Sequence, residues 1–273
     1  MRFAICNETF QGWGWDETCA TVAELGYDAI EVAPFTLAPD VRTLDASRRA
    51  SVRGVAEANG LAVTGLHWLL VSPEGLSLTC DEAEVRAATG AYLTSLVDFC
   101  ADLGGSVMVL GSPKQRRIAP GSNKDEALAR LGDALLPVLD RAEKAGVVIC
   151  LEPLPEPEAD LILTLDEAVA QVEAMGHRAL RTIFDVKSAS AESARPWELA
   201  RRHSERIAHV HANDANRRGP GFGETDFIPI LGSLNSMGYD GYVSVEVFDY
   251  SPDPVTLGRE SLRYLRGCLG ATG

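Results

Sequence analysis

Eight short apolar segments recur along the chain at near-regular spacing, and each is bounded by Gly, Pro, Asn or Asp, as β-strands commonly are. Between them, residues 87–103, 127–145, 165–175 and 255–265 carry apolar side chains at three- and four-residue intervals, which is typical of amphipathic helices. The expected strands are residues 3–6, 29–33, 62–67, 106–110, 147–152, 182–185, 207–211 and 243–247. Strands and helices that alternate eight times predict an α/β fold of the (β/α)₈ TIM-barrel type.

The length of the chain favours a single domain over residues 1–273, because α/β barrels often run to about 250 residues. Helix ends fit this scheme: Thr164 and Glu167 have the spacing of a capping box, and Gly104 and Gly146 end helices shortly before strands. An open doubly wound sheet with a dinucleotide site would need a Gly-x-Gly-x-x-Gly motif at the start of a helix that follows an early strand. The sequence has no such motif at the start of an expected helix. The glycine-rich residues 219–223 are therefore interpreted as a loop after the seventh strand.

Four acidic or imidazole side chains end four consecutive expected strands, namely Glu152, Asp185, His211 and Glu246. The carboxyl ends of parallel strands meet at one end of a barrel, where barrel enzymes build their active sites. A single such residue is more often a helix cap or part of a surface ion pair. Carboxylates that end apolar strands are costly to bury without partners, however, so four of them in register predict one shared metal site.

Three carboxylates and one imidazole form an oxygen-rich ligand set. Such a set suits Mn²⁺ or Mg²⁺, with Co²⁺ and Zn²⁺ as alternatives, and it lacks the thiolates that would select zinc. Four protein ligands in an octahedral shell leave two positions for neighbouring substrate oxygens. A divalent ion held in this way would acidify a C–H bond next to a carbonyl and stabilise the resulting enediolate.

Aromatic and imidazole side chains follow the first and third expected strands. His67 and Trp68 come after the third, and Trp13 and Trp15 lie in the loop after the first. Aromatic faces there could form the wall of a sugar site, and they could equally close the mouth of the barrel.

Charged side chains in two other loops could contact substrate oxygens. Arg217 and Arg218 follow His211, and Glu158 lies in an acidic stretch after the fifth strand. Each could also be an ordinary solvated loop charge.

Composition excludes several classes of partner. The chain has 25 basic and 39 acidic residues and a net charge of −14, which repels a polyphosphate backbone, so no nucleic-acid partner is expected. Since no apolar run of about 18 residues exists and the N-terminus enters a strand directly, a cytoplasmic protein without a membrane span is expected. Six scattered cysteines without Cys-x-x-Cys spacing favour neither structural zinc nor a disulfide framework.

With these strand ends, the chain resembles the xylose-isomerase-like TIM-barrel superfamily, and within it the sugar (phosphate) isomerase/epimerase group that includes ketose 3-epimerases. The resemblance covers essentially the whole chain. The motifs that carry it are Cys-Leu-Glu-Pro at 150–153, Phe-Asp at 184–185, His-Val-His-Ala-Asn-Asp at 209–214, Gly-Phe-Gly-Glu-Thr-Asp-Phe at 221–227 and Gly-Tyr-Val-Ser-Val-Glu at 241–246.

The resemblance implies that Glu152 and Glu246 act as an acid/base pair as well as metal ligands, with Asp185 and His211 completing the site of one divalent ion, commonly Mn²⁺. One glutamate would remove a proton through a cis-enediolate, and the other would return it on the opposite face. It also implies that a sugar is the small-molecule partner and that the protein forms a homo-oligomer, either a dimer or a tetramer.

Substrate contacts are implied less directly. Arg217 and Glu158 match family positions that contact substrate hydroxyls. Ketose 3-epimerases usually have a His three residues after the metal Asp, whereas this chain has Ser188 there, with Lys187 beside it. This departure preserves the reaction class and leaves the identity of the sugar open.

Related barrels leave other activities open. Inosose dehydratases and lyases that act on 3-keto-glycosides use the same metal and carboxylates. Family 2 apurinic endonucleases need additional histidines, and although His67 fits one of their ligands, Ser188 replaces another. A barrel that binds sugar without chemistry is the remaining alternative.

Overall fold

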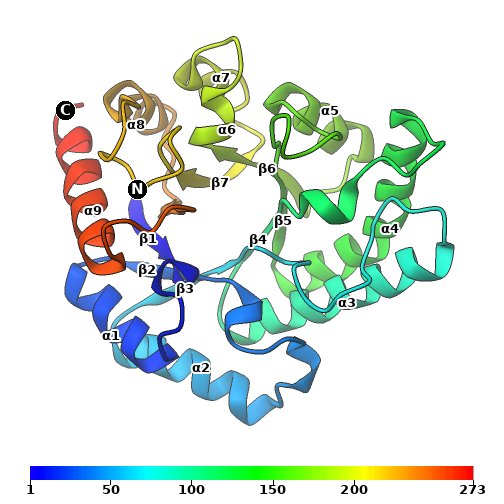
Figure 1. Cartoon of the computed structure of the whole chain (residues 1–273), viewed down its shortest axis with the longest axis horizontal. Coiled ribbons are helices and arrows are strands. Elements are labelled where there is room, and N and C mark those ends of the chain that lie inside the picture. Colours follow the sequence, from blue (N-terminus) through cyan, green and yellow to red (C-terminus); the bar gives the residue numbers. More distant parts are fainter. Residues whose placement is uncertain (273) are drawn as a thin grey trace.

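Eight parallel strands form a closed barrel in which each strand pairs with its neighbour in the sequence and β1 pairs with β8. The computed structural model describes residues 1–272. Figure 1 shows the strands at the centre of the molecule and the helices around them. The strands are β1 Arg2–Cys6, β2 Ala29–Val32, β3 Ala62–Leu66, β4 Val107–Leu110, β5 Val148–Leu151, β6 Leu180–Asp185, β7 Ile207–Ala212 and β8 Tyr242–Val245. The predicted TIM barrel is confirmed.

The α-helices follow the strands in the order that the sequence predicts, with two short helices, α6 and α7, after β6. Their bounds are α1 Trp15–Leu25, α2 Ala46–Ala58, α3 Ala83–Asp102, α4 Lys124–Ala145, α5 Leu165–Met175, α6 Val186–Ser190, α7 Pro196–Arg202, α8 Phe227–Ser236 and α9 Pro254–Gly270. The bounds of α5 agree with the expected helix, whereas α3, α4 and α9 begin earlier than expected. The Thr164 side chain caps α5 at the backbone N–H of Glu167, as its spacing predicts. Among residues 1–272, no helix has the length and apolar character that a membrane span requires.

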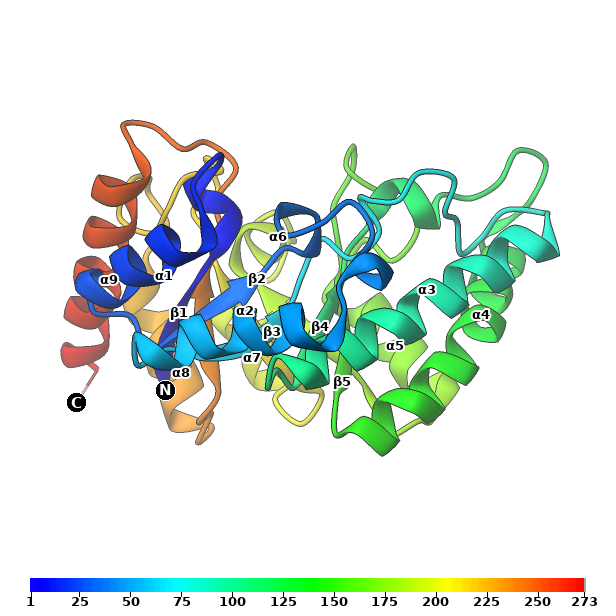
Figure 2. The same ribbon diagram turned by 90° about the horizontal axis from the view of Figure 1, so that it is seen from below.

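The carboxyl ends of the strands lie at one end of the barrel because all the pairings are parallel. Asp185 pairs with His211 in the register of β6 and β7. Backbone pairing also continues past two strand ends, since the Glu152 N–H donates to the Leu110 carbonyl at 3.2 Å and the Glu246 N–H to the Ala212 carbonyl at 3.3 Å. Figure 2 shows the loops that follow the strands extending above the barrel.

Most of the apolar core lies between the sheet and the helices. Leu110, Leu151 and Phe184 belong to this layer. Alternate residues of β4, β5 and β6 form a much smaller buried cluster of Val109, Cys150 and Ile183. Because side chains alternate across a strand, this small cluster faces the barrel interior. The remaining interior is therefore available to buried polar side chains.

Backbone strain is concentrated at the end of the barrel where the strands finish. Four non-glycine residues have φ between 41° and 70°, a region that costs about 1–2 kcal/mol per residue for most side chains. They are Trp68, Ser112, Ile162 and Arg217, and each lies in a loop that follows a strand. Strain of this kind is often found at functional sites.

Candidate metal centre

The four side chains that end β5 to β8 meet in one buried cluster. Glu152, Asp185, His211 and Glu246 each offer a donor atom, and these atoms all lie within 4.8 Å of one another. The exposed fractions of the four residues are 8%, 2%, 0% and 4%. The sequence-based prediction that they converge is therefore confirmed.

Burial and mutual repulsion decide the protonation of the two glutamates. Burial, together with the charges of Glu246 and Asp185, raises the pKa of Glu152 to about 8. Burial also opposes ionisation of Glu246, but attraction to His211 outweighs it and lowers the pKa of Glu246 below its usual value. Without a bound cation, burial and repulsion therefore favour a proton on Glu152 over one on Glu246.

His211 lies between two sets of carboxylates. Its Nδ1 atom is 3.2 Å from an oxygen of Glu246 and 4.0 Å from one of Glu152, whereas its Nε2 atom is 3.0 Å from Glu31. Burial disfavours the imidazolium form, but the charges of Glu246 and Glu31 outweigh burial and raise the pKa of His211. Nδ1 is buried and makes no hydrogen bond within residues 1–272.

The cluster fits a divalent cation. Three buried carboxylates surround an imidazole nitrogen that has no hydrogen-bond partner among the described residues, and this nitrogen faces two of them. Carboxylate oxygens with one imidazole suit Mn²⁺ or Mg²⁺ and also accommodate Zn²⁺ or Co²⁺. A cation would offset the repulsion that raises the pKa of Glu152.

Neighbouring polar groups orient Asp185. One oxygen of Asp185 accepts the backbone N–H of Ser188 at 2.6 Å, and the other accepts the amide of Asn213 at 2.7 Å. The same amide lies 3.4 Å from Glu246. The Ser188 hydroxyl is buried and makes no hydrogen bond among the described residues. Asn213 thus links the strand ends of β6 and β8.

The segment after β4 leaves room for Glu152. A Cβ atom at Gly111 would lie 2.0 Å from a carboxylate oxygen of Glu152, so a larger residue there would displace the Glu152 carboxylate. Arg116, which is fully buried, donates to the backbone carbonyls of Gly111, Glu152 and Leu161. The Arg116 guanidinium therefore ties the loop after β4 to the end of β5.

Lys187 and Glu158 form an ion pair beside the cluster. The Lys187 ammonium, which is 7% exposed, donates to Glu158 at 2.7 Å. It lies 5.2 Å from the ring centre of Phe248, and the guanidinium of Arg217 lies 5.3 Å from the same ring. The structure thus places two predicted substrate contacts, Lys187 and Arg217, against one aromatic ring, and the third, Glu158, is bonded to Lys187.

The other residues predicted to contact substrate, Trp68, His67 and Trp15, lie in different surroundings. Trp68 is 37% exposed and packs 6.2 Å from Phe248 between ring centres. His67 is buried, and its Nε2 atom lies 2.7 Å from an oxygen of Glu8. Trp15 begins α1 and donates its indole N–H to the Val52 carbonyl of α2, and within residues 1–272 no polar or ring contact joins Trp15 to the cluster. Its contact with a sugar stays a prediction.

Sequence reasoning missed three residues that surround the cluster, namely Glu31, Asn213 and Arg116. Glu31 left a signal, because a charged residue interrupts the apolar strand β2 and would be costly to bury there alone. Asn213 and Arg116 lie in loops, where a polar residue is ordinary.

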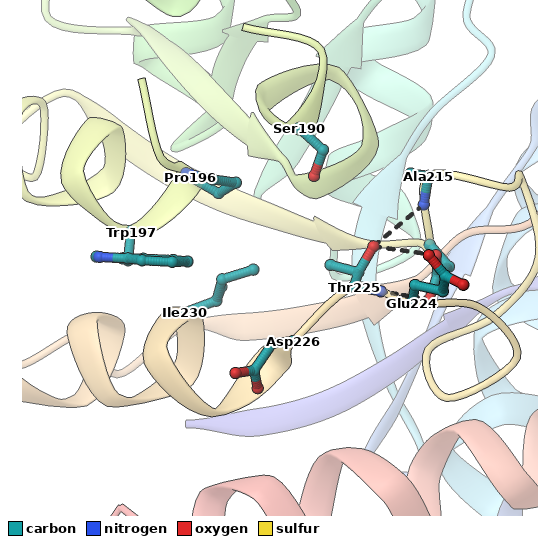
Figure 3. A pocket seen from close by; sticks show the side chains of 9 residues that line it. Ser190, Pro196, Trp197, Ala215, Glu224, Thr225, Asp226 and Ile230 are labelled. Carbon is teal, nitrogen blue, oxygen red and sulfur yellow. Dashed lines mark hydrogen bonds between the residues drawn. The ribbon is translucent and has the colours of Figure 1, made fainter. Parts of the chain in front are cut away.

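A separate cavity of about 300 Å³ lies beside α6, α7 and α8. Figure 3 shows Trp197 and Ile230 on one side and Asp226 and Glu224 nearby. None of the four residues of the cluster lines this cavity.

The clustered carboxylates lie at the carboxyl ends of the strands of a closed parallel barrel, which is where barrel enzymes build their active sites. The chain belongs to the family described as xylose isomerase-like TIM barrel, which matches residues 19–268.

Proteins with similar sequences are named as epimerases. D-psicose 3-epimerase of Agrobacterium fabrum is 28% identical over 233 residues, which cover 83% of this chain and 77% of the relative. The 3-dehydro-D-guloside 4-epimerase of Escherichia coli is 24% identical over 98% of this chain and 100% of its own length.

Solved structures agree on the fold. A D-psicose 3-epimerase crystallised in the presence of D-fructose superposes with a TM-score of 0.87 at 23% identity, covering 99% of this chain and 100% of the other. The apo 3-keto-D-glucoside 4-epimerase from E. coli gives a TM-score of 0.83 at 23% identity, over 98% and 100%.

The raised pKa of Glu152 predicts a pH-dependent stability of the metal-free protein. Between about pH 4.5 and 8 the folded state keeps a proton that the unfolded state loses, so stability falls as pH rises through this window. The variant Glu152→Gln does not titrate at this position. We expect its free energy of unfolding to fall less steeply, by up to about 1.4 kcal/mol per pH unit.

Urea unfolding in a chelating buffer at pH 5, 6, 7 and 8 measures this difference. The exposed Glu156→Gln variant is the matched control and should follow the wild type. Parallel curves for the wild type and Glu152→Gln would show that Glu152 is ionised throughout the window.

Proposed function

We propose that this protein is a divalent-metal-dependent sugar epimerase or isomerase that removes a proton from a carbon next to a carbonyl group. The observation that carries the proposal is the convergence of Glu152 and Glu246 with Asp185 and His211 in one buried cluster. The two glutamates follow β5 and β8, which are not neighbours in the barrel, so they approach a shared centre from different strands.

Each residue has a role in this proposal. A divalent ion, with Mn²⁺ the preferred candidate, would supply Lewis-acid stabilisation of the negative charge that develops on the substrate oxygens. One glutamate accepts the proton of the C–H bond, and the other donates a proton to the opposite face of the same carbon. The reverse reaction exchanges the two roles, so inversion at that carbon needs no oxidant or reductant. Asp185 and His211 would hold the ion together with the two glutamates.

The names of the relatives support this substrate class. A 3-epimerase of a 2-ketose and a 4-epimerase of a 3-keto-glycoside both invert the carbon next to a carbonyl group. In both substrates the carbon next to the carbonyl carries an acidic proton, and its removal would begin the inversion. We therefore propose that the substrate of this protein is a sugar or sugar derivative in which a carbonyl lies next to the carbon that reacts.

Loss of one glutamate tests the two-base mechanism. In D₂O, the Mn²⁺-loaded wild type should incorporate deuterium from solvent at one carbon of its substrate. We expect Glu246→Gln to slow this exchange by about 10²–10⁴-fold, since it removes a general acid/base. Proton NMR after quenching and metal removal measures the exchange, with ketohexoses, ketopentoses, inososes and 3-keto-glucosides as substrates.

Glu156→Gln is the control for this experiment, and both variants should keep the far-ultraviolet circular dichroism of the wild type. An exchange rate in Glu246→Gln equal to that of the wild type would contradict the two-base mechanism. An alkene product instead of an epimer would identify a lyase.

Substitutions in the ion pair beside the cluster test the predicted substrate contacts. We propose that Lys187 donates to a substrate oxygen and that Glu158 accepts from a hydroxyl, because the Lys187 ammonium lies near Asp185 and Glu152 and is bonded to Glu158. A hydrogen bond to a charged group contributes about 1.5–3 kcal/mol, so Lys187→Met should raise KM about 10–100-fold. Steady-state kinetics measure this change.

Glu158→Gln keeps the shape of the side chain and should give a smaller increase in KM. If both variants have the KM of the wild type, the ion pair is only a structural contact between the loop after β5 and α6.

A further inference from the structure

We propose that Glu31 of β2 positions His211 for metal binding, by accepting the Nε2 proton of His211 so that the Nδ1 lone pair faces the other three ligands. Glu31 is 1% exposed, and one of its carboxylate oxygens lies 3.0 Å from Nε2 of His211. The inference rests on the metal site of the proposed function.

Glu31 and Glu246 compete for the same ring proton. A neutral imidazole carries one N–H group, and Nδ1 of His211 lies 3.2 Å from Glu246 on the opposite side of the ring from Glu31. If the proton were on Nδ1, it would bond to Glu246, and His211 would present no lone pair to a cation. Glu31 favours the tautomer with the proton on Nε2.

A second histidine holds Glu31 in place. The other carboxylate oxygen of Glu31 lies 2.8 Å from Nε2 of His209, and the rings of His209 and His211 meet edge-on with centres 5.3 Å apart. Both oxygens of Glu31 are therefore engaged, and the carboxylate cannot rotate without losing a hydrogen bond. Nδ1 of His67 lies 3.8 Å from Glu31. Three of the five histidines of the sequence thus surround this carboxylate.

Glu31 reaches His211 across the barrel interior. In the closed sheet, β1 and β8 separate β2 from β7, so no backbone pairing brings the two residues together. The bond between them depends on the polar part of the interior that the small apolar cluster of Val109, Cys150 and Ile183 leaves free. A carboxylate behind a metal-ligating histidine fixes the orientation and tautomer of the ring, and loss of such a partner typically weakens metal affinity by 10–100-fold.

The variant Glu31→Gln tests this role, because it keeps the size of the side chain and removes its charge. We expect the dissociation constant for Mn²⁺, measured by isothermal titration calorimetry, to rise about 10–100-fold. Nitrogen NMR of histidine-labelled, metal-free protein, recorded at a pH above the raised pKa of His211 so that the ring is neutral, should show the His211 proton on Nε2 in the wild type and a loss of that preference in the variant. Thr64→Val, which alters another buried polar side chain with no hydrogen bond among the described residues, should bind Mn²⁺ as the wild type does.

A merely structural role for Glu31 would give a different result. The melting temperature would fall, while the Mn²⁺ affinity and the His211 tautomer would stay as in the wild type, and this outcome would overturn the inference. If Glu31→Gln does not fold, His209→Asn removes one of the two bonds that hold Glu31. It should raise the dissociation constant about tenfold, at the lower end of the same range, and an unchanged value would overturn the inference.

These measurements separate the inference from the proposed function. If the wild type binds Mn²⁺ but exchanges no proton of any sugar, the proposed function fails and the Glu31 measurements still stand. If the wild type binds no Mn²⁺, the metal site fails, and the tautomer of His211 in the two proteins decides whether Glu31 positions the ring.

Discussion

Electrostatic repulsion among three buried carboxylates is the constraint on which the site depends. Glu152, Asp185 and Glu246 are brought together because parallel strands in register end at one edge of the barrel. The protein relieves part of this repulsion with His211 and, without a cation, with a proton on Glu152. A divalent ion would relieve the rest, so the same crowding that disfavours the metal-free site favours metal binding.

Polar side chains in the barrel interior help to position the ligands of the cluster. A TIM barrel is commonly filled by layers of apolar side chains, but here the apolar interior cluster is small: it consists of Val109, Cys150 and Ile183, with the partly buried Val107, Val148 and Ala208 packed against it. Glu31 and His209 occupy other interior positions and bond to each other. The interior therefore positions ligands as well as filling space, while α6 supplies Lys187 and the loops after β5 and β7 supply Glu158 and Arg217.

Sequence reasoning predicted the parts of the molecule that have a local signature. The barrel follows from alternating periodicities, and the convergence of the strand ends follows from the barrel, so Asp185 and Glu246 could be placed without coordinates. Glu31 could not be assigned a partner, because its bond to His211 depends on which side chains fill the interior of the closed barrel. Asn213 and Arg116 were missed because loop conformation, and not periodicity, brings them to Asp185 and to the backbone of Glu152.

Diffraction from crystals soaked in Mn²⁺, recorded where manganese scatters anomalously, tests the metal site most directly. We expect one strong anomalous peak among Glu152, Asp185, His211 and Glu246, with the proton-bearing Nε2 of His211 turned to Glu31. An ion bound elsewhere, or Mn²⁺-saturated crystals with no peak among these four side chains, would contradict it.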